Sequence, residues 1–394
     1  MSKKSRSKIW FLVHSWLALP IWFFVLIVCV TGTLAVLSQE IVWLANPSMR
    51  ASQPTDDAPR LSYQQVIEAI NKAEPLTVVQ SISRPDGAHF ALDVGVSYPD
   101  GRSVVVYVNP YSGVIQGVAP EFNFQAFTRA LHGWWLVPFT NGYSWGWYLV
   151  SFLGLPLLAS LVTGLVVYKR FWKGFFRPTL RFRHGARIFW GDFHRLSGIW
   201  SIWFIAVISI TGTWFLIQAL LFDNQISIST ETNLPSMSRE AVPLSADGTP
   251  PRIDLDRAIA IAAQEIPGLE ASFVSLPGNA YSHLEVGGRG WYPLMFQTAT
   301  LNPYNGEVDA LRLISDRSAL EFVTDSMRPL HTGDFGGLWI KLIWAFFGLL
   351  LSMMVLSGLL IWTKRTALAT ANAFRRNNKK SPMATRNELS EAGL

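Results

Sequence analysis

Four long apolar runs dominate the pattern of hydrophobic and polar positions along the chain. They extend over Ile9–Leu37, Ser144–Tyr168, Gly198–Leu221 and Leu338–Trp362. Each run is near or above the roughly 20 residues that an α-helix needs to cross a bilayer. Long polar regions separate the first run from the second and the third from the fourth. The pattern therefore predicts four membrane-spanning helices with two large polar regions between them.

Each polar region has the pattern of a small α+β domain. Apolar residues recur at helical spacing in Leu61–Ala73 and again in Leu255–Glu265. Alternating stretches such as Ser103–Val108 predict strands. The segments 109–113 (Asn-Pro-Tyr-Ser-Gly) and 302–306 (Asn-Pro-Tyr-Asn-Gly) end these stretches, and their Pro and Gly suit a tight hairpin turn.

Two copied stretches each lead from a histidine to a glycine. His14 leads to Gly32 and His194 to Gly212, and both separations are 18 residues. Because an α-helix turns about 100° per residue, 18 residues return to the same face about 27 Å further along. That length is close to the thickness of a bilayer's hydrocarbon core. A continuous helix would place an imidazole at one membrane face and a bare glycine at the other.

A second copied motif lies just before the second and fourth apolar runs. Arg129 stands three residues before His132, and Arg328 stands three residues before His331. The order of helix, polar domain and helix thus occurs twice in the same orientation. Repeats of this kind are related by an axis along the membrane normal.

Composition fits a protein that is partly in the membrane and partly in water. Of 394 residues, 50% are hydrophobic and only 15% are charged, yet the mean hydropathy is a modest +0.25. The single cysteine, Cys29, lies in an apolar run, so we expect neither a disulfide framework nor covalent Cys-x-x-Cys-His haem attachment. The net charge of +6 comes from basic residues that border the runs, which favours membrane topology over nucleic-acid binding.

Three basic segments predict the topology. They contain Lys3, Lys4, Arg6 and Lys8; Lys169, Arg170, Lys173, Arg177, Arg181, Arg183 and Arg187; and Lys364, Arg365, Arg375, Arg376, Lys379 and Lys380. By the positive-inside rule these segments are cytoplasmic, and the polar domains face the other side. A cleaved signal peptide is the alternative for the first run, but the run is too long and is copied in the third.

The duplication places four histidines in two facing pairs. An axis between the repeats brings His14 opposite His194 at the cytoplasmic face, and His132 opposite His331 at the outer face. An ionisable residue in a membrane bundle is costly and indicates function. Facing imidazoles without thiolates or carboxylates suit the two axial positions of a haem iron. We therefore predict two non-covalent b-type haems that carry electrons across the bilayer.

Glycines and arginines complete the predicted haem sites. We expect four glycines to border the flat porphyrins: Gly32 and Gly212 the outer one, Gly164 and Gly358 the inner one. Arg129 and Arg328 are expected to pair with the propionates of the outer haem, and Arg195 or Lys8 with those of the inner. Two alternatives stay open, because small residues also permit close helix packing and arginines also serve as interfacial charges.

The order and duplication of these motifs resemble the PepSY-associated transmembrane family. The resemblance rests on the doubled His…Thr-Gly-Thr, Asn-Pro-Tyr-Ser/Asn-Gly and Leu-His motifs and covers nearly the whole chain. Within that family the chain is similar to the FoxB-type siderophore-iron reductases of the bacterial inner membrane. The resemblance implies PepSY-like periplasmic domains and haem-dependent reduction of siderophore-bound iron(III) to iron(II).

The expected architecture is an α-helical membrane protein with α+β extracytoplasmic domains, built as two parallel repeats of helix, PepSY-like domain and helix. Its segments are 1–40 (cytoplasmic N-terminus and first transmembrane helix), 41–140 (periplasmic domain 1), 141–168 (second helix), 169–190 (basic cytoplasmic loop), 191–221 (third helix), 222–335 (periplasmic domain 2), 336–363 (fourth helix) and 364–394 (basic cytoplasmic tail).

The expected function is a multi-pass inner-membrane ferric-siderophore reductase with both termini in the cytoplasm. The chain has no Gly-x-Gly-x-x-Gly after a strand, so the electron donor is another molecule, quinol or a cytoplasmic reductase. Its partners are then the ferric siderophore, that donor and the lipid bilayer, with no nucleic acid. One alternative is a metal-ion transporter or accessory that uses the histidines, although zinc and copper prefer clustered ligands. The other is a membrane-anchored PepSY binding or inhibitory module, which leaves the histidines unexplained.

Overall fold

The computed structural model describes residues 3–55, 57–169, 171–229, 234–243, 248 and 250–363. The predicted basic tail after Thr363 lies outside these residues, as do Arg170 and the side chains of residues 1–8. The chain forms two compact units. The helical unit comprises Met1–Val30, Phe152–Ile210 and Phe346–Leu394, and the sheet unit comprises Thr31–Ser151 and Thr211–Ala345.

Four helical segments are long and apolar enough to cross a membrane. They are Ile9–Val36, Trp145–Val167, Ile202–Asp223 and Gly337–Thr363. The sequence predicted all four, with bounds that differ by a few residues. The chain is therefore a multi-pass membrane protein.

The first span is not one continuous α-helix. Helix α1 (Lys3–Ala18) passes through a 3-10 turn (Leu19–Ile21) into α2 (Trp22–Val36). Pro20 lies in this turn, where its missing N–H and its ring disrupt the regular hydrogen-bond ladder. The predicted continuous helix between the first histidine and its glycine is therefore wrong.

A second interruption precedes the third span. Helix α9 (Ala186–Trp200) ends at Ser201, and α10 (Ile202–Asp223) begins directly after it. His194 and Gly212 consequently lie on different helices. An 18-residue spacing alone does not place a histidine and a glycine on the same helical face.

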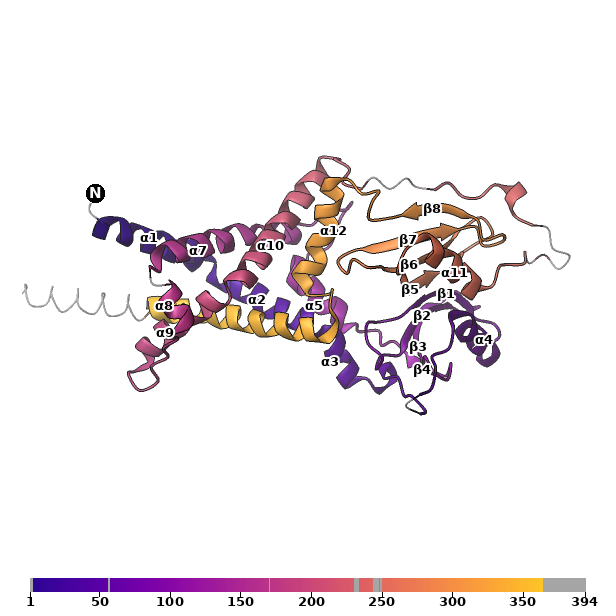
Figure 1. The fold of residues 1–394 in the computed structure, drawn as a ribbon, viewed down its shortest axis with the longest axis horizontal. Coiled ribbons are helices and arrows are strands. Elements are labelled where there is room, and N and C mark those ends of the chain that lie inside the picture. The colour runs from indigo at the N-terminus through magenta and orange to yellow at the C-terminus, as the bar shows by residue number, and fades with distance from the viewer. Residues whose placement is uncertain are drawn as a thin grey trace, which may run out of the picture. The chain divides into compact units, whose positions relative to one another are not determined.

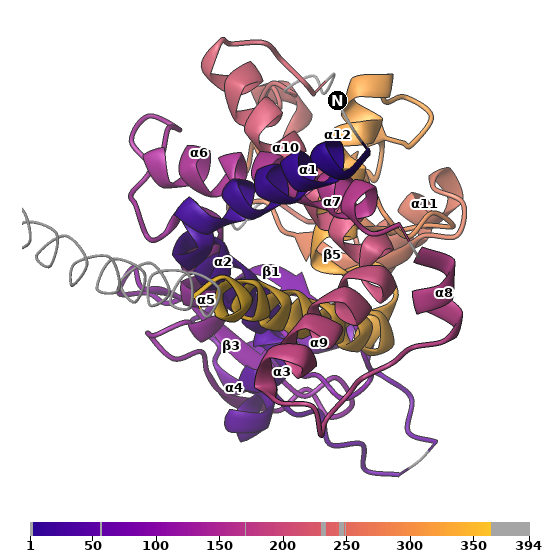
Figure 2. The same ribbon diagram turned by 90° about the vertical axis from the view of Figure 1, so that its left-hand side faces the viewer.

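Helices alone build the described part of the helical unit. Helix α7 (Gly154–Val167) packs along α1, and the two lie side by side in Figure 2. The short helix α8 (Phe171–Phe176) packs against α9. The second span contains α6 (Trp145–Phe152) as well as α7, with a break at Leu153.

The sheet unit contains an eight-stranded antiparallel sheet in the order β4-β3-β2-β1-β5-β6-β7-β8 (Figure 1). Its strands are β1 Val78–Ser83, β2 Leu92–Ser97, β3 Ser103–Val108, β4 Ile115–Val118, β5 Glu270–Ser275, β6 Leu284–Arg289, β7 Phe296–Leu301 and β8 Val308–Arg312. The two predicted domains meet where β1 pairs with β5, Ile82 opposite Val274. What the sequence showed as two domains is one continuous sheet.

Both predicted outer helices are present. Helix α4 is Tyr63–Ala73 and α11 is Leu255–Glu265. Ser62 and Gln65 form a reciprocal capping box at the start of α4. Asp254 caps α11 by accepting hydrogen bonds from two backbone N–H groups.

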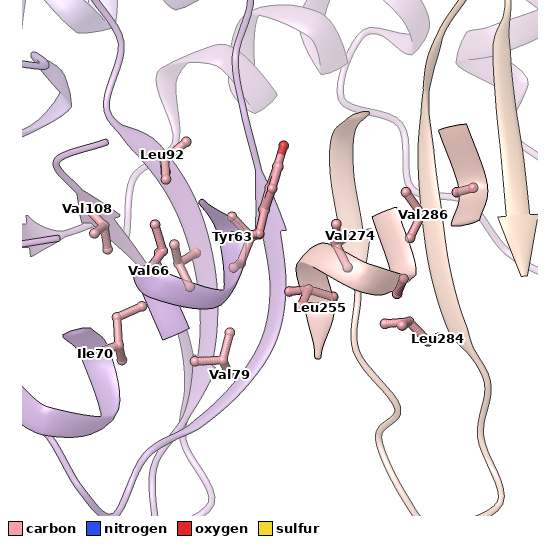
Figure 3. Packing of buried hydrophobic residues seen from close by; sticks show 14 of the residues in the cluster. Tyr63, Val66, Ile70, Val79, Leu92, Val108, Leu255, Val274, Leu284 and Val286 are labelled. Carbon is pink, nitrogen blue, oxygen red and sulfur yellow. The ribbon is translucent and has the colours of Figure 1, made fainter. Parts of the chain in front are cut away.

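One hydrophobic core serves both halves of the sheet (Figure 3). Val66 and Ile70 of α4 pack with Val94 of β2, and the same core includes Val274 and Val286. All five side chains are at most 1% exposed. Burying branched apolar side chains from both halves stabilises them as a single body.

Two further helices of the sheet unit were not separated from the spans by the sequence analysis. Helix α5 is Phe124–Trp134 and α12 is Ala319–Thr332. Each begins at a polar cap, Asn123 for α5 and Ser318 for α12. The remaining short elements are α3 Ser38–Ala45 and the 3-10 turns Pro47–Met49 and Arg239–Ala241.

Candidate functional site

The helical unit brings two of the predicted histidines together. His14 lies on α1 and His194 on α9. Their ring centroids are 6.4 Å apart and the ring planes are inclined by 77°. The two imidazoles therefore face each other, as the duplication predicted, whereas haem ligation stays a prediction.

The imidazole of His14 is held through its Nδ1 atom. That atom is 3.1 Å from the carbonyl oxygen of Ser160 and 3.1 Å from Oγ1 of Thr163. The Thr163 hydroxyl itself donates to the carbonyl of Ala159 at 2.8 Å. A carbonyl oxygen only accepts, and the hydroxyl proton is already used, so Nδ1 carries the hydrogen. The lone pair of the ring is then on Nε2, the atom available to a metal.

His194 is held in the same manner by the fourth span. Its Nδ1 is 3.1 Å from the carbonyl oxygen of Met354 and 3.0 Å from Oγ of Ser357. The Ser357 hydroxyl donates to that same carbonyl at 2.8 Å. The same reasoning places the hydrogen on Nδ1 and the lone pair on Nε2. Both rings of this pair are fixed in the form that ligates metals.

The sheet unit brings together the other two histidines. His132 on α5 and His331 on α12 have ring centroids 5.9 Å apart and ring planes inclined by 37°. Both histidines lie before the spans and not within them, on helices that the sequence analysis did not identify. Each stands in the last turn of an amphipathic helix that ends before the span begins.

Threonine hydroxyls contact both histidines of this second pair. Nδ1 of His331 is 2.7 Å from Oγ1 of Thr211, and Nδ1 of His132 is 3.5 Å from Oγ1 of Thr31. Burial lowers the pKa of His331 to about 3, and the neighbouring His132 adds to the effect. His331 is therefore neutral at physiological pH, which is the state a metal ligand requires.

The predicted glycines lie against the imidazoles. A Cβ on Gly32 would be 2.7 Å from Cε1 of His132. A Cβ on Gly164 would be 3.4 Å from Cε1 of His14, and one on Gly358 would be 3.5 Å from Cε1 of His194. Three of the four predicted glycines thus lie against a histidine ring, whereas their expected contact with porphyrin stays a prediction. Gly212 follows Thr211, the partner of His331, in α10.

One local motif therefore supports each histidine. A Thr or Ser hydroxyl contacts Nδ1 and belongs to the residue directly before a predicted glycine: Thr31, Thr211, Thr163 and Ser357. Sequence reasoning missed these hydroxyls, although they stand beside residues that it selected. The signal was the recurrence of Thr-Gly or Ser-Gly at all four positions.

Arg129 and Arg328 lie near one another on exposed positions of α5 and α12. Partial burial of Arg129 lowers its pKa, nearby Asp334 and Glu40 raise it, and the charge of Arg328 lowers it further. Two neighbouring guanidiniums attract an anion, and their predicted pairing with propionates stays a prediction. Glu40 is held by Lys341 at 2.8 Å.

Arg195 has a partner within the protein. Asp192, one turn earlier on α9, binds Arg195 and also accepts from Nε of Arg181 at 2.8 Å. The Asp192 side chain is 2% exposed. A propionate near Arg195 would therefore have to share this arginine with Asp192. The side chain of Lys8, the other predicted partner, lies outside the described residues.

The ring separation of each histidine pair matches that expected for two imidazoles bound to one metal ion. Two metal–imidazole bonds of about 2 Å each, placed end to end, separate the ring centres by roughly 6 Å. The observed separations are 6.4 and 5.9 Å. Within the described part of the chain, no group of three or more His, Cys, Asp or Glu side chains is arranged to hold a metal ion. The donor sets present are thus paired imidazoles, and such pairs would suit the iron of a haem.

These features define a multi-pass membrane protein with a paired imidazole site in each of its two units. The PepSY-associated TM region family matches residues 11–365, and the chain belongs to this family. No curated protein matches the chain.

Proposed function

We propose that the chain is a di-haem reductase of the bacterial inner membrane that reduces siderophore-bound iron(III) on the periplasmic side and releases iron(II). The observation that carries the proposal is the pair of facing imidazoles in each unit, 6.4 and 5.9 Å between ring centres. His14 with His194, and His132 with His331, would hold the iron of two non-covalent b-type haems. Haems held by two imidazoles would supply one-electron transfer in preference to oxygen binding.

Hydrogen-bonding groups of the chain hold the histidine rings through their Nδ1 atoms. Thr163 and Ser357, with the carbonyls beside them, hold Nδ1 of His14 and His194 and so leave Nε2 of each ring as the nitrogen available to a metal. Thr211 contacts Nδ1 of His331 in the other pair. A histidine whose second nitrogen is hydrogen-bonded is a fixed and more basic ligand. These contacts favour sites that stay rigid through electron transfer.

Charge supports the direction of electron flow. The basic loop between the second and third spans carries Arg177 and Arg181, and the positive-inside rule places such a loop in the cytoplasm. The loop adjoins α9, which carries His194, so the His14–His194 pair would receive electrons from quinol or a cytoplasmic reductase. The sheet unit, with the His132–His331 pair, would then deliver them in the periplasm. Hard oxygen ligands hold iron(II) less tightly than iron(III), so reduction favours release.

The test is the haem content of single-histidine variants. The full chain, purified in detergent from cells with ample haem, is expected to show two b-type haems whose absorbance sharpens on dithionite reduction. His14→Ala or His194→Ala should remove one haem, and His132→Ala or His331→Ala the other. His184→Ala is the matched control, because His184 is an exposed residue of the basic loop.

Two results would overturn the proposal. One is a colourless protein from haem-replete cells, which favours a metal transporter or a PepSY binding module. The other is a variant of either pair that loses both haems or neither. Reduction of a ferric siderophore is followed separately, by trapping the iron(II) released from the dithionite-reduced protein.

A further inference from the structure

A cleft of about 560 Å³ opens in the sheet unit where β1 ends and β5 begins. Four segments contribute to its wall: Arg84–Gly87, Glu270–Ser272, Arg289–Trp291 and Phe335–Gly337. The first two come from opposite halves of the sheet, and the last follows α12. The volume is within the range of small-molecule sites in proteins.

Three buried polar atoms of residues in the cleft wall lack a hydrogen-bond partner within the described part of the chain. Among the described residues, no hydrogen bond reaches Nε of Arg84, Nε of Arg289 or Oγ of Ser272. All three atoms carry a hydrogen to donate. Buried donors are nearly always satisfied, by protein, water or ligand. Three such donors around one cleft indicate a ligand rich in acceptor oxygens.

The arginines of the cleft differ in whether carboxylates of the protein already neutralise their charge. Arg289 binds Asp86 at 3.0 Å and Asp334 at 3.2 Å, so its charge is compensated. Arg84 stacks over the ring of Tyr63 at 4.8 Å, and no carboxylate bonds to it in the described part of the chain. Arg60 also lines the cleft. A guanidinium over an aromatic ring, with no carboxylate bonded to it, can still donate its N–H groups to paired oxygens of a ligand.

Aromatic side chains complete the wall. Trp291 is 74% exposed and Phe296 is 40% exposed, and Phe335 lies beside them in the lining. Exposed rings of this size are costly in water unless a partner covers them. A ligand with flat aromatic faces as well as anionic oxygens matches both parts of the surface.

We propose that this cleft binds the ferric chelate and selects negatively charged catecholate-type complexes, with Arg84 as the residue that recognises their charge. The inference rests on the proposed function, because it names the substrate class of that reductase. The cleft is also close to a histidine that would hold a haem, because its lining residue Phe335 is near His331 in the chain. Phe335 is four residues after His331, so their Cα atoms are at most about 14 Å apart.

The test uses gallium(III), which has the charge of iron(III) but is not reduced, so binding needs neither haem nor a donor. The probe is the anionic gallium(III) tris-catecholate complex, and the opposite-charge comparison is the cationic gallium(III) complex of desferrioxamine B. Equilibrium dialysis against the detergent-solubilised full chain, with gallium measured by elemental analysis, gives the affinity. We expect saturable binding of the anionic complex and at least tenfold weaker binding of the cationic one.

Arg84→Gln is expected to weaken binding of the anionic complex by about tenfold or more, the effect of one lost charge-assisted hydrogen bond. Arg102→Gln is the matched control. Arg102 also stacks over a tyrosine ring, Tyr98 at 5.5 Å, but lies outside the cleft lining. Arg102→Gln should change the affinity for the anionic complex by less than twofold. Ser272→Ala is a smaller change and serves as the test if Arg84→Gln fails to fold. This variant should weaken binding of the anionic complex severalfold.

The outcomes separate this inference from the proposed function. Equal binding of the two gallium complexes, or equal affinity of Arg84→Gln and Arg102→Gln, overturns the cleft assignment even if the protein reduces ferric chelates. Arg84-dependent binding by a protein that holds no haem supports the cleft and overturns the reductase. In the haem-loaded protein, Arg84→Gln should raise KM for the ferric tris-catecholate and leave kcat unchanged.

Discussion

The two histidine pairs differ in the distance between their rings and in the groups that contact Nδ1. In the helical unit the rings are 6.4 Å apart and nearly perpendicular, and in the sheet unit they are 5.9 Å apart and inclined by 37°. His14 and His194 each contact a carbonyl and a hydroxyl through Nδ1. His331 contacts the hydroxyl of Thr211 at 2.7 Å. The backbone carbonyls therefore fix the tautomer of both rings in the first pair, whereas the Thr211 hydroxyl can donate or accept and leaves the tautomer of His331 open.

The glycine beside His132 is packed more closely against its ring than the glycines beside His14 and His194 are against theirs. A Cβ at Gly164 or Gly358 would make ordinary van der Waals contact with its histidine, at 3.4 and 3.5 Å. A Cβ at Gly32 would be 2.7 Å from the His132 ring, closer than real side chains approach. The difference shows that glycine is required beside His132 and is merely suitable beside His14 and His194.

The largest expected effect comes from adding a methyl group at these glycines. Gly32→Ala should force the His132 ring out of place and cost about 1–3 kcal/mol of overpacking, with loss of the haem bound by the sheet unit. Gly164→Ala should keep both haems. The measurement is haem content per chain with reduced-minus-oxidised spectra. Equal haem loss in the two variants would contradict the packing difference.

Much of this arrangement was predictable from the sequence because its signals are local or copied. The four spans follow from apolar runs, and the pairing of His14 with His194 follows from duplication. The helix breaks at Leu19–Ile21 and Ser201 were missed because a run of apolar residues does not reveal where an α-helix is interrupted. Pro20 was the one visible signal.

The rest depends on contacts between residues far apart in the chain. The pairing of β1 with β5 joins segments nearly 200 residues apart, and no local pattern encodes it. The contact between Thr211 and His331 is likewise visible only in three dimensions. Helix α12 was predictable in principle from its cap at Ser318, which the sequence analysis did not use.

The effect of intermediate size is a change in the stability of the sheet. It tests whether the haem held by His132 and His331 is lost when the sheet unfolds. Burial raises the pKa of Asp93 in β2 to about 6, above its ordinary value of 3.8. The folded state therefore holds this proton more tightly than the unfolded state, so stability is full below pH 3.8 and falls as the pH rises through 6. Asp93→Asn should stabilise the sheet unit at pH 8 by on the order of 2 kcal/mol and change little at pH 4.

The measurement for Asp93→Asn is thermal unfolding at both pH values, followed by the spectrum of each haem. The haem of the sheet unit should survive to a higher temperature at pH 8, and the haem of the helical unit should be lost at its usual temperature. A stabilisation of equal size at pH 4 would show that burial of the charged carboxylate is not the cause.

The smallest expected effect compares single hydroxyls of the two pairs. Thr211→Val keeps the shape of the side chain but removes the hydroxyl 2.7 Å from Nδ1 of His331. Thr163→Val does the same for His14, whose Nδ1 still has the Ser160 carbonyl as an acceptor. A lost hydrogen bond of about 1 kcal/mol corresponds to roughly 40 mV for one electron.

Thr211→Val should therefore shift the midpoint potential of the haem in the sheet unit by about that amount. Thr163→Val should shift the potential of the haem in the helical unit by less than half as much. A larger shift in Thr163→Val would mean that the Ser160 carbonyl does not hold the His14 ring and that the contrast between the two pairs is wrong.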